Sequence, residues 1–142
     1  MERSSTLESN VTYFSEEICS KADDTLRFAY LITLNRDEAH KCVQSTFKTL
    51  AAKIADFKDT DNLTKLIVHE SWQHLKDKTF TPQTSHIAPN AFNKLSIETR
   101  AAIAAIDYLG LSAEDTVEAL GMTNSSLRRK LAEGRNQLIK QS

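Results

Sequence analysis

Residues 109–138 read LGLSAEDTVEALGMTNSSLRRKLAEGRNQL, and this stretch predicts a helix-turn-helix. Ser112 is placed to cap a first, short helix over Ala113–Leu120, and Asp115 follows three residues later in a capping-box arrangement. Gly121 comes next, at the position where a residue in the left-handed conformation commonly ends a helix. The pattern therefore predicts a capped helix followed by a tight turn.

The second helix of this motif is predicted over Ser125–Ile139, with Thr123 placed to cap it. Its leucines fall on one side of the helix, and its basic residues lie mostly elsewhere on the surface: Arg128, Arg129, Lys130 and Arg135. A short helix, a glycine turn and a longer basic helix match the geometry that lays a recognition helix into a DNA major groove. The alternative is an ordinary helical hairpin whose basic face is simply solvated.

The composition favours an all-helical protein. The chain of 142 residues contains only 3 glycines and 2 prolines, and this length allows one domain or two small ones. The net charge of −1 argues against a general polyanion binder. The charge is uneven, however, because residues 122–142 carry five basic side chains and one acidic side chain. That local excess is what phosphate binding requires.

The rest of the chain predicts further helices. They are expected over Tyr13–Leu34, Ala39–Ile54, Asn62–Lys78 and Leu95–Tyr108, and the second has the clearest apolar stripe at spacings of three and four. Residues 81–90 contain both prolines and no periodicity, which is typical of a linker. We therefore predict two small helical domains, residues 11–79 and residues 93–142, joined by a linker over residues 80–92. The relative arrangement of the domains stays open.

Other kinds of chemistry find little support. Cys19 and Cys42 are too few and too isolated for a disulfide framework or a zinc cage, and we expect small buried side chains in a reducing compartment. His69 and His74 are five residues apart and do not share a helix face as metal ligands would. No metal, cofactor or enzymatic activity is indicated. The chain lacks a membrane-spanning run and a signal-peptide core, so we expect a cytoplasmic protein without membrane insertion.

Taken together, these motifs resemble bacterial RNA polymerase sigma factors of the extracytoplasmic-function type. The similarity to the fourth region of that family runs through Leu95–Arg100, Tyr108–Ser112, Leu120–Thr123 and Leu127–Leu131. Asp37–Phe47 resembles the core helix of the second region. The resemblance implies a three-helix region 2-like bundle, a linker and a three- to four-helix region 4-like domain.

The resemblance also implies partners and binding residues. In the family, the second region binds core RNA polymerase and opens the promoter near −10, and the fourth region reads the −35 element. Carried over to this sequence, the DNA-binding residues are Ser125, Ser126, Arg128, Arg129, Lys130 and Arg135. Such side chains can read guanine edges or bind phosphates. The polymerase-binding residues are Ala39, His40, Lys41, Val43, Gln44 and Phe47. An anti-sigma factor is a further expected partner.

The chain departs from the family pattern in the two helices expected to bind polymerase and to open the promoter, and also at Thr116 and Val117, where the family usually has an apolar residue and a small alanine. His40 and Lys41 stand where the family usually has two acids, which reverses the charge of a face expected to meet basic groups of the polymerase. The third helix should carry a tryptophan-leucine start, an asparagine, an aspartate and a basic tail for promoter melting. The aligned residues here are Asn62, Leu63, His69, Gln73, Lys76 and Lys78.

Three functions follow from these patterns. The first is a sigma factor-like initiation protein that binds core RNA polymerase and promoter DNA. The second is a degenerate sigma-like module that acts by protein binding, either by sequestering an anti-sigma factor or by occupying polymerase. The third is a simple helix-turn-helix regulator, for which palindromic half-sites one turn apart are expected.

Overall fold

The structure is a computed structural model that describes residue 16 and residues 20–53, 62–83 and 93–140. The described part contains no strand, so the predicted all-α class is confirmed. Its helices are α2 (Ala22–Thr33), α3 (Arg36–Ala52), α4 (Leu63–Leu75), α5 (Ile97–Ile103), α6 (Ala113–Leu120) and α7 (Asn124–Lys140). A π-helical segment, η3 (Ala104–Tyr108), continues α5 without a break.

The helix-turn-helix has the boundaries that the sequence predicts. The bounds of α6 are as predicted, and α7 extends one residue beyond the prediction at each end. By contrast, α4 ends at Leu75 rather than Lys78, because Lys76 is extended and Asp77 has a left-handed φ of 65°. The last helix before the motif starts at Ile97 rather than Leu95, because Ser96 caps it. Much of the predicted first helix and most of the predicted linker lie outside the described residues.

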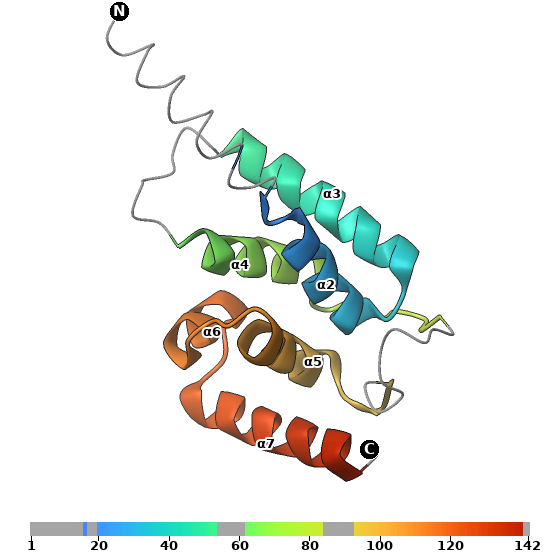
Figure 1. Cartoon of the computed structure of the whole chain (residues 1–142), viewed down its shortest axis with the longest axis vertical. Coiled ribbons are helices and arrows are strands. Elements are labelled where there is room, and N and C mark those ends of the chain that lie inside the picture. The colour runs from blue at the N-terminus through green and yellow to red at the C-terminus, as the bar shows by residue number, and fades with distance from the viewer. Residues whose placement is uncertain (1–15, 17–19, 54–61, 84–92, 141–142) are drawn as a thin grey trace, which may run out of the picture.

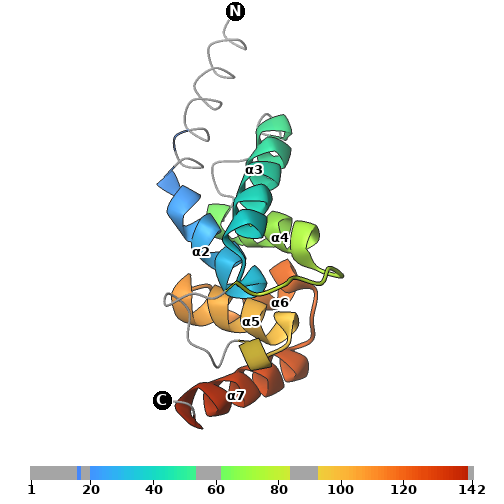
Figure 2. The same ribbon diagram turned by 90° about the vertical axis from the view of Figure 1, so that its right-hand side faces the viewer.

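Helices α2, α3 and α4 form one layer, and α5, α6 and α7 form a second layer beneath it (Figure 1). In both views α5 lies beside α2, α6 lies beside α4, and α7 lies on the side away from the first layer (Figure 2). A single cluster of buried apolar residues connects the layers, with members such as Phe28, Ile32, Val68, Ala101 and Ala105. The N-terminal and C-terminal helices therefore share one core.

The segment after α4 is fixed to the turn between α2 and α3. The side chain of Asn35 caps α3 by accepting a bond from the Glu38 N–H (3.1 Å), and its Nδ2 donates to the Thr81 carbonyl (3.0 Å). Gln83 completes the contact, because its N–H donates to the Leu34 carbonyl (2.8 Å) and its Oε1 accepts from the N–H of Arg36 (2.9 Å). The start of the predicted linker thus runs along the first layer.

Arg100 makes a buried polar contact between the layers. Its Nη1 donates to the Ile32 carbonyl at 2.6 Å, and its Nε donates to the Leu95 carbonyl at 3.0 Å. The Ile32 carbonyl lies in the last turn of α2, where carbonyls lack an intrahelical donor. The N–H that would continue the helix belongs to Arg36 and instead bonds Gln83. Burial lowers the pKa of Arg100, yet an arginine stays protonated in such a setting.

We predict that Arg100→Met destabilises the fold by about 2–3 kcal/mol, because two buried carbonyls lose a charged donor while the side-chain volume is nearly kept. Urea unfolding measures the effect. Arg129→Met is the matched control, since Arg129 is exposed and surface changes of this kind stay within about 0.5 kcal/mol. Equal stability of the two variants would show that Arg100 does not join the layers.

Candidate nucleic-acid interface

The first helix of the helix-turn-helix is capped at both ends. Ser112 Oγ accepts a bond from the Asp115 N–H at 3.0 Å, as the capping pattern predicts. Gly121 has a left-handed φ of 66°, and its N–H donates to the Val117 carbonyl at 2.9 Å. This conformation is costly for residues with a Cβ atom. The glycine therefore fixes the direction in which the chain enters α7.

The start of α7 is fixed in a similar way. Thr123 Oγ1 accepts a bond from the Ser126 N–H at 3.1 Å, so the predicted cap is confirmed. Leu127 is buried, and Leu131 and Leu138 pack against the main core. These leucines orient the helix about its own axis. The opposite side of α7 consequently faces away from the first layer (Figure 1).

Two side chains of α5, Ile103 and Thr99, pack directly against the backbone of α7 at Gly134. A Cβ atom on Gly134 would lie 2.3 Å from Ile103 Cδ1 and 2.9 Å from Thr99 Cγ2. Any side chain here would push α7 outward or displace the buried Ile103. Sequence reasoning did not single out Gly134, although a glycine inside a helical pattern is a signal of close packing.

The predicted DNA-binding residues lie on or near the outer surface of α7. Ser125, Arg128 and Arg129 are exposed, and Ser126 and Lys130 are half-buried. Within the described residues, the side chains of Arg128, Arg129 and Lys130 make no ion pair. Three adjacent cations on the second helix of the motif, without carboxylate partners there, form a surface suited to phosphates and base edges.

Arg135 differs from the other predicted DNA-binding residues, because it is already paired. Its Nη2 donates to Asp107 Oδ1 at 2.6 Å and its Nε donates to Asp107 Oδ2 at 3.2 Å, which makes the contact bidentate. The hydrogen bonds and charge of Asp107 raise the pKa of Arg135 further. A DNA phosphate at this position would have to compete with a carboxylate of η3.

The predicted polymerase-binding residues are spread over the inner and outer sides of α3. Ala39 is completely buried in the main core, so it can affect a partner only through the position of the helix. His40 and Gln44 are exposed, and Lys41 is exposed with its Nζ 3.5 Å from Glu38 Oε1. The remaining two predicted residues, Val43 and Phe47, are half-buried.

The cysteines and the potential metal ligands were the other groups considered from the sequence. Cys42 is buried as predicted, and burial raises the pKa of its thiol; Cys19 lies outside the described residues. No cluster of three potential metal ligands occurs within the described ranges.

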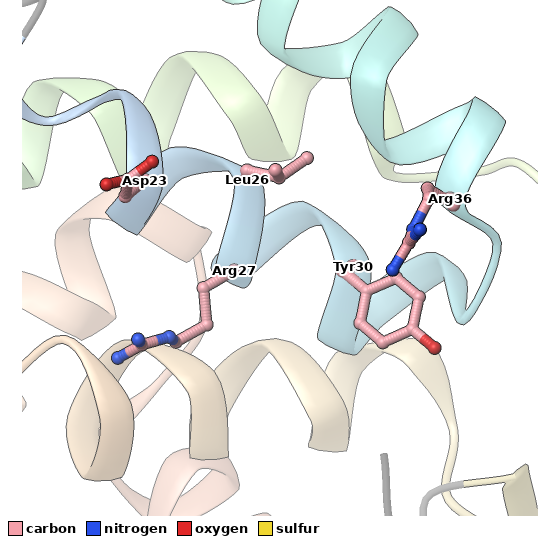
Figure 3. A pocket seen from close by; sticks show the side chains of 5 residues that line it. All are labelled: Asp23, Leu26, Arg27, Tyr30 and Arg36. Atoms are coloured by element: carbon pink, nitrogen blue, oxygen red, sulfur yellow. The ribbon is translucent and has the colours of Figure 1, made fainter. Parts of the chain in front are cut away.

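A hollow of about 250 Å³ beside α2 is lined by Leu26, Tyr30 and three charged residues, Asp23, Arg27 and Arg36 (Figure 3). In the part of the chain that the structure describes, no helix is long and apolar enough to cross a membrane.

No protein-family model and no curated protein matches the chain. Solved structures that share its fold include two bound to a protein partner. The sigma factor RpoE from Bartonella quintana, in complex with the anti-sigma factor NepR, is 22% identical with a TM-score of 0.77, over 89% of this chain and 94% of that chain. CnrH, in complex with the cytosolic domain of CnrY, is 14% identical with a TM-score of 0.78, over 96% of this chain and 92% of that chain. The chain therefore has the fold of a sigma factor, and the predicted fold is confirmed.

Proposed function

We propose that this protein is a cytoplasmic sigma factor-like initiation protein that binds duplex DNA through α7 and core RNA polymerase through α3. The observation that carries the proposal is the basic triplet Arg128, Arg129 and Lys130 on α7, of which the two arginines are exposed and none has a carboxylate partner among the described residues. The caps of both motif helices support the proposal, because they fix the position of α7 and its basic residues before any ligand binds. The proposed DNA target is a −35-type promoter element.

A second function is favoured by the contact between α4 and α6. In the family that the sequence resembles, α4 would open the promoter, yet here α6 packs against it (Figure 1). His40 and Lys41 also give α3 a charge unlike that of the family. A module that binds an anti-sigma factor, or occupies polymerase without opening DNA, is compatible with both the packing of α6 on α4 and the charge of α3. Both structural neighbours were solved as complexes, RpoE with the anti-sigma factor NepR and CnrH with part of CnrY.

Duplex binding tests the recognition helix. Arg129→Ala and Lys130→Ala should each weaken binding, by about 1–3 kcal/mol where the side chain reads a base. Fluorescence anisotropy at low salt, with duplexes that contain candidate −35 elements, measures the effect. Lys48→Ala is the matched control, because Lys48 is an exposed lysine on α3. Unchanged binding by both α7 variants would rule out α7 as the DNA-binding helix.

Asp107 should limit the contribution of Arg135 to DNA binding. We expect Asp107→Asn to tighten duplex binding and to steepen its salt dependence, by up to about 0.9 in the logarithmic slope for one added phosphate contact. Glu133→Gln is the control, since it removes one negative charge from α7 and Glu133 makes no ion pair with a described residue. If both variants change the affinity equally, net charge alone accounts for the effect.

Co-elution with core RNA polymerase tests the polymerase contact, which a module that only binds an anti-sigma factor would lack. A sigma factor-like protein should bind the purified core enzyme of its own host and be displaced by a housekeeping sigma factor. The binding should weaken in Gln44→Ala, because Gln44 is exposed in the middle of the proposed contact face. Absence of binding at micromolar concentration would overturn the polymerase contact and leave only the module that binds an anti-sigma factor.

A further inference from the structure

Polar and charged side chains join the N-terminal half of α4 to α6, beside the buried apolar residues Val68, Trp72 and Ala119 of the main core. Lys65 Nζ lies 3.7 Å from Asp115 Oδ1 and also forms an ion pair with Glu118. Asn62 Nδ2 donates to Asp115 Oδ2 at 3.0 Å. Further along α4, His69 Nδ1 lies 3.1 Å from the Ala119 carbonyl oxygen, which can only accept a bond. The N-terminal cap and the first two turns of α4 are thereby bonded to α6.

The charges of this contact complement each other at the helix ends. The first turn of α4 contains no acidic residue and contains Lys65, an arrangement that the helix dipole disfavours. The carboxylates of Asp115 and Glu118 supply negative charge there from the neighbouring helix. The hydrogen bond to Glu118 raises the pKa of Lys65. Lys65 is thus held between two carboxylates of the other layer.

The opposite side of the layer contact has no exposed ion pair between the layers among the described residues. There α2 meets α5 and η3 through fully buried apolar residues, including Ile32, Ala101 and Ala105, together with Arg100. Apolar contacts and buried hydrogen bonds are little affected by moderate salt. Exposed ion pairs are screened, because the Debye length falls from about 10 Å at 0.1 M to about 3 Å at 1 M salt. The two sides should therefore respond differently to ionic strength.

We propose that Asn62, Lys65 and His69 with Asp115 and Glu118 form a charge-dependent latch that holds the helix-turn-helix over α4. The α2–α5 side acts as the hinge. With the layers together, α6 engages the polar atoms of two residues, Asn62 and His69, that stand at promoter-melting positions in the resemblance, although both side chains stay exposed. The inhibitory role of the latch therefore rests on the proposed function. The existence of the latch does not. A competing polyanion, or high salt, opens it by replacing the carboxylates around Lys65.

Distance measurements between two nitroxide labels test the latch without DNA or polymerase. The labels are placed at Gln73→Cys on α4 and Glu114→Cys on α6, both exposed positions, in a chain with Cys19→Ala and Cys42→Ala. At low salt we expect one short-distance population in this chain. Lys65→Glu should increase the long-distance population by about three-fold or more, since it turns attraction into repulsion at two carboxylates.

Two further chains make the outcome decisive. Lys48→Glu makes the same charge change on exposed α3 and should leave the distances unchanged. Lys65→Glu combined with Asp115→Lys and Glu118→Lys reverses both sides and should restore the short distance. An unchanged distribution in Lys65→Glu, or no recovery in the reversed chain, would overturn the latch. Loss of DNA binding in α7 variants does not affect these distances, so failure of the proposed function is recognised separately.

Discussion

The arrangement of the whole molecule depends on the contact between α2 and the α5–η3 helix. On this side the two layers share one apolar core, in which Ile32 and Ala105 are completely buried. Separating the layers would expose this surface to water, at about 25 cal/mol for each Å². It would also leave the Ile32 carbonyl without the guanidinium of Arg100. The N-terminal and C-terminal helices are for this reason parts of one folded body in the described structure.

This shared core determines which surface of the helix-turn-helix remains available. Because α5 and α6 lie between the first layer and α7, the first layer cannot cover the outer side of α7 (Figure 2). Gly134 then brings α7 close to Ile103, and Leu127 sets its rotation. The cations on the outer side are consequently held on a rigid helix, which lowers the entropic cost of binding a ligand. Formation of the core and presentation of the basic side are two consequences of the same packing.

The sequence was sufficient to predict the features that depend on local chemistry. Ser112, Gly121 and Thr123 each determine a helix end through their own side chain or φ, so the helix-turn-helix boundaries could be predicted. Features that join distant residues could not. The bonds of Arg100 to Ile32 and of Lys65 to Glu118 span more than fifty positions, and no periodicity encodes such a pairing. The Asp107–Arg135 pair was missed for the same reason, although both residues are visible in the sequence.

The closed arrangement gives the two DNA-facing elements of the proposed function unequal access. The basic triplet on α7 is available while the layers are together, whereas Asn62 and His69 on α4 are bonded to α6. A closed molecule would accordingly meet duplex DNA first through α7, in a contact dominated by phosphates. Strand opening through α4 would require α6 to leave, and a ligand can cause that only by binding the open form more tightly than the closed form. In the proposed function, duplex contact would therefore precede any use of α4, because α7 lies outermost.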